Sequence, residues 1–269
     1  MPNPSSEHPL VRAVTGDYLA LVDAEVPGLV EGLYLTGSVA LDDFHPSHSD
    51  IDFVAVTARK PGPEDLAGLR RAHARLVAKH KRPHFDGAYV TWAELAADAE
   101  NAAPGPHAFA NGFQDGSRAE RHPVTWQTIV QCGVAVRGPS PAEAKILGDP
   151  DGLESWTVGN LGAYWRPLWT RMSRLPSAEG LAALGTAQAA WSVLGVTRLH
   201  HTLATGRITS KTGAGAYALT AFEQRWHRIV EDCVRIRSGG GSRYRNPYRR
   251  RTDVLAYTDM VIRDALAVR

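Results

Sequence analysis

The sequence is poor in cysteine and contains no long hydrophobic run. Its 269 residues include 2 cysteines, Cys132 and Cys233, which lie far apart and fit neither a disulfide framework nor a metal-binding spacing. No apolar stretch approaches the roughly 20 residues that a membrane-spanning helix needs. The polar N-terminal segment lacks the basic-then-apolar pattern of a signal peptide. We therefore expect a cytoplasmic protein with reduced thiols and no membrane partner.

Lysine is also scarce, with 5 Lys against 25 Arg, and the formal net charge of +2 is small. This small total conceals an asymmetry, because residues 1–154 carry a net charge of −8 and residues 155–269 a net charge of +10. A composition of 43% hydrophobic and 22% charged residues allows a core and excludes general disorder. The asymmetry indicates two segments with different roles.

The first half of the chain alternates between strand-like and helix-like patterns. Helical spacing occurs over residues 10–26, 61–81, 92–100 and 125–131, and apolar, β-branched strand patterns occur over 32–38, 51–57, 86–91 and 134–137. Residues 101–122 are rich in Gly, Pro and polar side chains, which predicts a loop region. This half is therefore predicted to be an α/β domain with a short mixed sheet and flanking helices.

After residue 151 the strand patterns fade. Helices are predicted over residues 153–172, 178–205, 212–236 and 252–268, with a flexible glycine-rich break at 238–242. We expect a domain boundary between residues 148 and 153. The predicted organisation is an α/β domain over residues 1–150 and an all-α domain over residues 151–269.

One stretch, from Leu33 to Val56, carries the strongest chemical signal. It contains a strand, the turn Gly37-Ser38, a connection, and then Asp50 and Asp52 at the start of a second strand. Alternate strand residues share a face, so the two carboxylates should point the same way, where a cation such as Mg²⁺ would relieve their repulsion. The Gly-Ser turn lets a phosphate approach the backbone. These parts suit a nucleoside triphosphate held with Mg²⁺, whereas the alternative is an ordinary turn and a capped strand.

The order of these parts resembles the signature of the polymerase-β-like nucleotidyltransferase superfamily. That signature is an apolar strand, Gly-Ser, about a dozen residues, Ser-Asp-x-Asp and a second apolar strand, here with Ser49 before Asp50. The resemblance implies that Gly37, Ser38 and Ser49 contact the nucleotide. It also implies that Asp50 and Asp52 are catalytic residues that bind Mg²⁺.

The superfamily usually has a third carboxylate on a later strand. Asp86, at the start of the strand over residues 86–91, is the best candidate, with a role in holding metal or taking the proton of an acceptor hydroxyl. Glu94 is the second choice. The alternative for Asp86 is a turn with Gly87 at the strand start.

The chain also resembles the aminoglycoside adenylyltransferases of the streptomycin and spectinomycin type. Besides the first motif, the stretch Thr197–Ala218 matches an Arg in a helix, a Thr-Gly-Arg-Ile turn and a Lys that opens the next helix. The resemblance implies that Lys211 contacts the phosphates of ATP, and Arg198 is either a nucleotide contact or a structural residue. Two positions depart from the family: Asp42 replaces a turn glycine, and Gln188 stands where one acidic drug contact is expected.

The family resemblance implies an enzyme that uses Mg²⁺ to transfer AMP from ATP to a hydroxyl of a small acceptor, most simply an aminoglycoside, and so to give antibiotic resistance. Residues 225–251 contain nine Arg, with Tyr244 and Tyr248 among them. Such a segment could bind nucleic acid or could be a solvated, mobile loop. An RNA or protein acceptor is therefore the alternative, and a binding protein without activity is the third reading. The oligomeric state is open.

Overall fold

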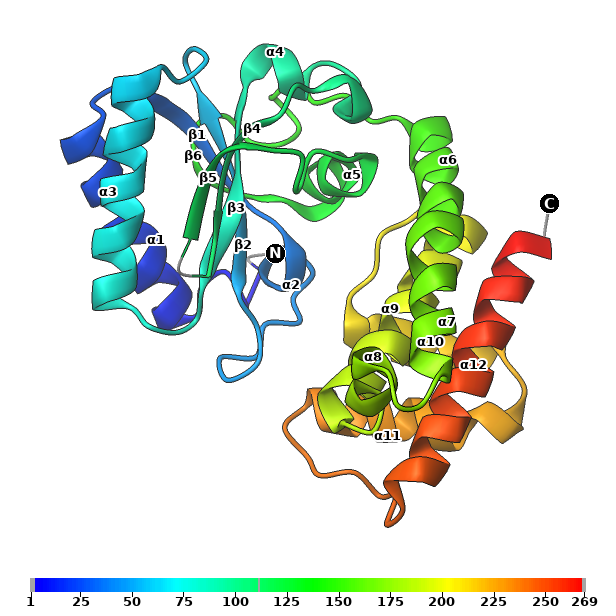
Figure 1. Ribbon diagram of the computed structural model, residues 1–269. Coiled ribbons are helices and arrows are strands. Elements are labelled where there is room, and N and C mark those ends of the chain that lie inside the picture. The colour runs from blue at the N-terminus through cyan, green and yellow to red at the C-terminus, as the bar shows by residue number, and fades with distance from the viewer. Residues whose placement is uncertain (1–2, 111, 268–269) are drawn as a thin grey trace. The chain divides into compact units, whose positions relative to one another are not determined.

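The computed structural model describes residues 3–110 and 112–267 (Figure 1). Contacts between Cα atoms divide the chain into two compact units, residues 1–149 and residues 150–269. No helix in the described part of the chain is both long and apolar enough to cross a membrane. The two units have different architectures.

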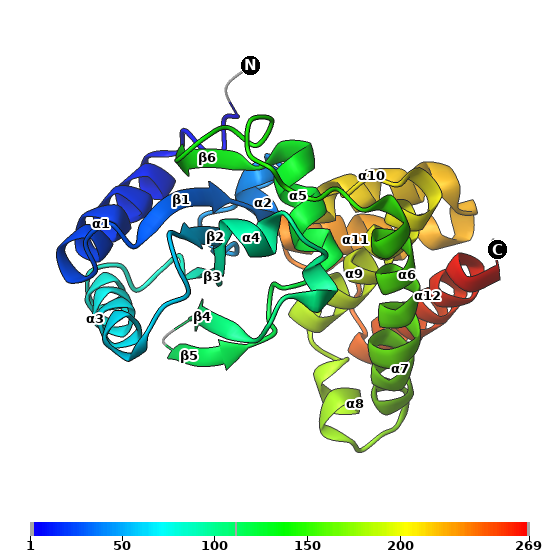
Figure 2. The ribbon, with the colours of Figure 1, turned by 90° about the horizontal axis from the view of Figure 1, so that it is seen from above.

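The first unit is built on a six-stranded mixed sheet with the order β5-β4-β3-β2-β1-β6, which Figure 2 shows in a row. Only β2 and β3 run parallel, and α3 forms the crossover between them. The strands are β1 (Val30–Leu35), β2 (Ile51–Thr57), β3 (Phe85–Thr91), β4 (Gly105–Phe109), β5 (Gly112–Ser117) and β6 (Val134–Arg137). This architecture confirms the predicted α/β class with a short mixed sheet.

Helices cover both faces of this sheet (Figure 1). The long helices α1 (Pro9–Glu25) and α3 (Pro63–Lys79) cover one face, and α4 (Trp92–Leu95) and α5 (Pro123–Cys132) lie against the other. Along β2, Ile51 and Phe53 pack under α1 and α3, whereas Val54 and Val56 pack on the opposite side. Because side chains alternate along a strand, Asp52 belongs to the α4 and α5 face.

Two local predictions in this unit are wrong. The region predicted as a loop over 101–122 contains β4 and β5, which form an antiparallel hairpin at the sheet edge; Asn111, within it, lies outside the described residues. The helix predicted over 92–100 consists of α4 and a separate 3-10 turn, Ala99–Asn101. Both errors fall where Gly, Pro and short polar side chains obscure the local pattern.

The second unit contains only helices and turns over its described residues, 150–267, which confirms the predicted all-α part. Its core combines apolar residues of α7, α9, α11 and α12. The helices are α6 (Pro150–Asn160), the π-helical turn η2 (Leu161–Trp165), α7 (Arg166–Ser173), α8 (Ala178–Ala182), α9 (Thr186–Thr205), α10 (Lys211–Ala221), the 3-10 turn η3 (Gln224–Trp226), α11 (His227–Arg237) and α12 (Pro247–Ala267).

Two of the long helices predicted in this unit are interrupted. The helix predicted over 178–205 breaks before α9, whose N-cap is Gly185, and the one over 212–236 breaks at Phe222, which has an extended backbone. The last helix begins earlier than predicted, at Pro247, and the predicted end at Val268 lies outside the described residues.

The glycine-rich segment 238–242, which was predicted to be a flexible break, makes hydrogen bonds to α11. The fully buried carboxylate of Asp232, on α11, accepts hydrogen bonds from the Ser242 hydroxyl at 2.7 Å and from the Arg243 backbone N–H at 2.6 Å. Gly240 donates its backbone N–H to the Arg235 carbonyl at 2.9 Å. These hydrogen bonds hold the segment against α11.

Candidate active site

The turn after β1 brings the backbone of Gly37 against the carboxylate of Asp52. The Thr36 N–H donates to the Asp52 carbonyl at 2.9 Å, and the chain then turns into the short helix α2 (Gly37–Ala40). Gly37 has φ +54°, and a Cβ at this position would overlap Asp52 Oδ2 and lie 2.7 Å from Cγ. Glycine is required here for two reasons, the left-handed backbone and the close approach of a carboxylate.

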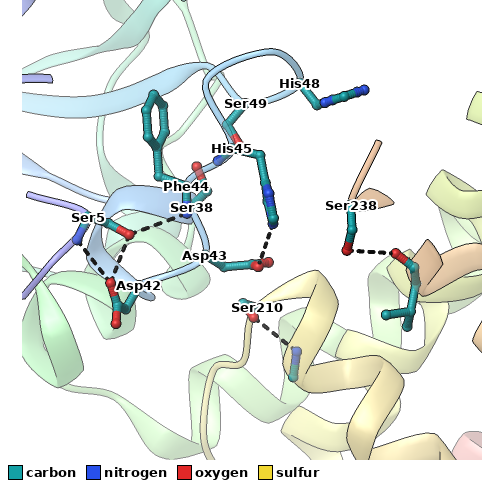
Figure 3. A network of polar contacts seen from close by, with 12 residues as sticks. Ser5, Ser38, Asp42, Asp43, Phe44, His45, His48, Ser49, Ser210 and Ser238 are labelled. Atoms are coloured by element: carbon teal, nitrogen blue, oxygen red, sulfur yellow. Dashed lines mark hydrogen bonds and ion pairs between the residues drawn. The ribbon is translucent and has the colours of Figure 1, made fainter. Parts of the chain in front are cut away.

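Ser38, in α2, and Ser49, two residues before β2, lie on either side of the loop between these elements. The Ser38 hydroxyl donates to the Asp50 carbonyl at 3.4 Å, and the Ser38 carbonyl accepts from the Asp43 N–H at 2.9 Å. The buried Ser49 hydroxyl accepts from the His45 N–H at 3.0 Å. Figure 3 shows Ser38, Asp43, His45 and Ser49 around this loop. These contacts of the two serines fix the loop that precedes the Asp-Ile-Asp motif.

The N-terminal segment braces the same loop. The Asn3 side-chain amide donates to the carbonyls of Val39 and Ala40 at 2.9 and 3.0 Å, at the end of α2. Asp42 has φ +52°, and its Oδ1 accepts from both the backbone N–H and the hydroxyl of Ser5, at 2.9 and 2.8 Å (Figure 3). Glycine adopts this left-handed backbone at little cost, and the Ser5 bonds offset the cost for Asp42.

Asp52 and Asp86 are direct neighbours in the parallel ladder between β2 and β3. Asp86 Oδ1 accepts the Ala110 backbone N–H at 2.6 Å. Burial raises the pKa of the Asp86 carboxyl, the nearby charge of Asp50 adds to that rise, and the Ala110 hydrogen bond opposes it. A carboxyl whose pKa is held above its ordinary value is suited to accept a proton.

Asp50, the first Asp of the Asp-Ile-Asp motif, forms an ion pair with an arginine. Arg82 Nη1 lies 3.3 Å from Asp50 Oδ1, and the Asp50 side chain is 40% exposed. Over residues 3–110 and 112–267, no group of three or more His, Cys, Asp or Glu side chains is arranged to hold a metal ion. The predicted triad of Asp50, Asp52 and Asp86 is therefore not gathered around one point, although its adjacent carboxylates are the donor type that Mg²⁺ prefers. Its role as a metal site stays a prediction.

Glu94, the second choice for the third carboxylate, has a structural role at the start of α4. Its carboxylate accepts from the Thr91 N–H at 2.7 Å and from the Thr91 hydroxyl at 3.0 Å, while the Glu94 N–H donates to the Thr91 hydroxyl at 3.2 Å. This is a capping box. Asp86 is the better candidate for the base.

In the second unit, the structure places Lys211 at the first position of α10. Ser210 caps this helix by accepting the Gly213 N–H at 3.0 Å, a bond that Figure 3 also shows. Arg198, on α9, donates through Nε to the Thr209 carbonyl at 3.0 Å and so fixes the turn that precedes Lys211. Gly206 ends α9 with φ +67°, the helix stop expected there. A positive side chain at a helix N-terminus suits phosphate binding.

Gln188, at the position expected to carry an acid, donates to Ser192 Oγ at 3.2 Å. Glu179, on α8, pairs with Arg171 at 3.0 Å. Trp165 stacks on Trp191 with ring centroids 4.6 Å apart, at the edge of the helical core.

Two protein-family models match the chain. Residues 20–85 match the nucleotidyltransferase domain, a span that contains Gly37 and Asp52 and ends one residue before Asp86. Residues 163–263 match the C-terminal domain of aminoglycoside adenylyltransferase, a span that contains Arg198 and Lys211. The chain is an aminoglycoside adenylyltransferase-like nucleotidyltransferase.

Among solved structures, this nucleotidyltransferase is similar in fold to the spectinomycin adenyltransferase AAD(9) from Enterococcus faecialis, solved with ATP and spectinomycin. The TM-score is 0.64 at 12% sequence identity, and the match covers 93% of this chain and 98% of the other. No curated protein matches the sequence. At this identity the structural likeness concerns the fold, so the roles of individual residues depend on the site geometry described above.

The sequence had no signal for two contacts of the site. Arg82 reaches Asp50 from the turn before β3, and the Ala110 N–H reaches Asp86 from the end of β4. Both contacts join residues that are distant along the chain. They arise from the order of strands in the sheet and not from any local pattern.

Proposed function

We propose that this enzyme transfers AMP from ATP to a hydroxyl group of a small acceptor, with an aminoglycoside-type antibiotic as the acceptor. The observation that carries this proposal is the contact of Gly37 with Asp52, beside Asp86 in the ladder. Because residue 37 has no side chain, the turn that can bind phosphate lies directly against the carboxylate of Asp52, the ladder neighbour of Asp86.

In the proposed reaction, the acceptor hydroxyl oxygen attacks the α-phosphorus of ATP in line. A new P–O bond forms as the bond to the leaving pyrophosphate breaks, and Asp86 accepts the hydroxyl proton. Asp50 and Asp52 would hold Mg²⁺, which supplies positive charge to neutralise the phosphate oxygens. Gly37 and Ser38 would receive the β- and γ-phosphates, with Ser49 fixing their loop.

We also propose that Lys211 contacts the phosphates of ATP and that Arg198 positions the turn before it. The first role follows from the place of Lys211 at the start of α10, and the second from the Arg198 bond to the Thr209 carbonyl. A lysine at a helix N-terminus adds its charge to that of the backbone N–H groups.

The arginine-rich segment favours a small acceptor over RNA, because most of its guanidinium groups have partners within the protein. Arg228 lies over the Tyr244 ring, Arg243 pairs with Glu231, Arg235 binds the Gly241 carbonyl, and Arg250 and Arg251 bind the carbonyls of Leu184 and Met172. Arginines used in this way are less available to phosphates.

The test is incubation with ATP labelled at the α-phosphate, with Mg²⁺, against spectinomycin, streptomycin, other aminoglycosides and total RNA. Spectinomycin comes first because the solved structure similar in fold binds it. Label in one antibiotic, with release of pyrophosphate and loss of both in Asp52→Asn, would support the proposal. Label found only in RNA would overturn the choice of acceptor, and no label in any acceptor would overturn the reaction.

A further inference from the structure

A pocket of about 370 Å³ lies between α3 and the β3-β4-β5 edge of the sheet. Part of its wall is formed by the aromatic rings of Phe85, Phe109, Phe113 and His73. The volume falls within the range of roughly 300–1,000 Å³ that is typical of small-molecule sites. Phe85 and His73 pack on the face covered by α1 and α3, opposite the face to which Asp52 belongs. The pocket is therefore distinct from the candidate active site.

One polar side chain lines this pocket from a buried position. His73 is 5% exposed, and burial lowers its pKa to about 3, so its ring is neutral. Its Nε2 lies 2.6 Å from the Tyr89 hydroxyl, which lies 2.8 Å from the Tyr18 hydroxyl. These three groups form a chain of hydrogen bonds under the sheet.

The direction of this chain fixes the tautomer of His73. Tyr18 is fully buried, and the Tyr89 hydroxyl is its one hydrogen-bond partner among the described residues. The Tyr18 hydroxyl must donate to Tyr89, because a buried O–H without an acceptor loses its hydrogen bonds to water and gains none in return. Tyr89 must then donate to Nε2 of His73. The neutral ring therefore carries its proton on Nδ1.

The Nδ1–H group is the free end of the chain. Within residues 3–110 and 112–267 it has no hydrogen-bond partner, and it is not among the unpartnered polar atoms that are sealed from solvent. Because His73 lines the pocket and its Nε2 is bonded to Tyr89, we infer that Nδ1–H faces the pocket. The pocket thus offers one oriented donor among aromatic rings.

We propose that this pocket binds a neutral, planar aromatic molecule of one or two fused rings, with an acceptor atom that takes the His73 Nδ1–H. Aromatic rings favour stacked or edge-on contact with such a ligand. At the rim, the guanidinium of Arg70 lies 5.6 Å from the Phe113 ring centroid and pairs with Asp115, so its charge is already compensated. The rim therefore does not demand an anion.

The backbone of Ala110 connects the pocket to the candidate active site. Ala110 lines the pocket, and its backbone N–H is the donor to Asp86 Oδ1. A ligand that contacts Ala110 would therefore be sensed by the amide that holds Asp86. The binding itself does not depend on the proposed function.

The experiment uses quinoline as the probe, which has two fused rings and one acceptor nitrogen, and naphthalene as its isostere without the acceptor. Binding is followed by NMR on the full-length chain, through the His73 ring nitrogens and the Ala110 amide. We expect quinoline to shift both signals and naphthalene to bind about two- to tenfold more weakly. Equal affinity for the two probes would overturn the role of Nδ1–H, and absence of quinoline binding at millimolar concentration would overturn the site.

Two matched variants locate the site. Ala74 and Ala78 are both exposed on α3, one turn apart, but only Ala74 lines the pocket. Ala74→Trp should fill the pocket and weaken quinoline binding at least tenfold, while Ala78→Trp should leave it within about twofold. Equal affinity of the two variants would place the probe elsewhere and refute the proposal. Because both substitutions are on a solvent-exposed helix face, the fold should persist in each.

Discussion

The Asp52 carboxylate occupies the space that a side chain at Gly37 would need, because a Cβ at Gly37 would overlap Asp52 Oδ2. The backbone of residue 37 is also left-handed, with φ +54°. The position of the Asp52 carboxylate therefore depends on a glycine in the turn. A side chain added at Gly37 must displace Asp52.

The first prediction concerns Gly37→Ala. It should lower kcat/KM of nucleotidyl transfer about 100-fold or more, because Asp52 must leave its position. It should also lower the free energy of unfolding by about 1–2 kcal/mol because of the left-handed backbone. Gly16→Ala is the matched control, since a Cβ there meets nothing within 4 Å on an exposed helix position. The control should retain activity, and a fully active Gly37→Ala would refute the coupling.

The second prediction concerns Arg82, which shares Asp50 with any metal ion bound there. Arg82→Ala should lower the Mg²⁺ concentration for half-maximal activity about two- to fivefold, because an exposed ion pair of roughly 0.2–1 kcal/mol no longer competes. Removal of Mg²⁺ with EDTA should abolish transfer in both proteins. Arg12→Ala, which breaks the exposed pair with Glu7, is the control. A higher Mg²⁺ requirement in Arg82→Ala would show that Arg82 supports the metal site instead.

The third prediction uses the raised pKa of Asp86. A carboxyl with a raised pKa in the folded state binds its proton more tightly than in the unfolded chain. Stability therefore falls as pH rises from about 4, the unfolded value, through the folded pKa. Asp86→Asn removes this dependence and can still accept the Ala110 N–H. With metal chelated, its melting temperature relative to the unsubstituted protein should increase between about pH 4 and pH 7.

The opposite sign is expected at Asp17, whose pKa is lowered by hydrogen bonds to Lys79 and His80. Asp17→Asn should lose stability at pH 7, and the loss should shrink as pH falls toward 4.

The substitution Asp86→Asn should also reduce nucleotidyl transfer about 100-fold or more, because the base is lost. An active Asp86→Asn would remove Asp86 from the reaction.

The fourth prediction separates Lys211 from Arg198. Lys211→Ala should weaken ATP binding about 10- to 100-fold, the range expected for a lost charged hydrogen bond. Arg198→Ala should lower the melting temperature as well, because the turn at Thr209 loses its anchor. Calorimetric titration and thermal unfolding of both variants distinguish the roles. Lys145→Ala, an exposed lysine in the first unit, is the control. Unchanged ATP affinity in Lys211→Ala would contradict its phosphate role.

How far the sequence predicted the site depended on the range of the interactions. The strand Ile51–Thr57 and its motif could be predicted, because β-branched residues follow a polar turn. The hairpin that supplies Ala110 could not, since Gly105–Phe109 and Gly112–Ser117 contain no Val, Ile or Thr. Its strands exist because they complete the sheet edge beside β3. The pairing of Asp86 with Asp52 could not be predicted either, because it depends on the register between two strands that are separated by α3.

The last prediction concerns Asp232 and the turn that the sequence suggested was flexible. The carboxylate is fully buried, and Asp232→Ala would leave the Ser242 hydroxyl and the Arg243 N–H without their acceptor. We expect a loss of roughly 2–4 kcal/mol in the free energy of unfolding, measured by urea denaturation.

Glu231→Ala is the matched control for Asp232→Ala. Its carboxylate is 50% exposed and lies 3.6 Å from Arg243, so its removal should change stability by less than about 0.5 kcal/mol. If the two variants were equally stable, the buried carboxylate would not be what holds residues 238–243.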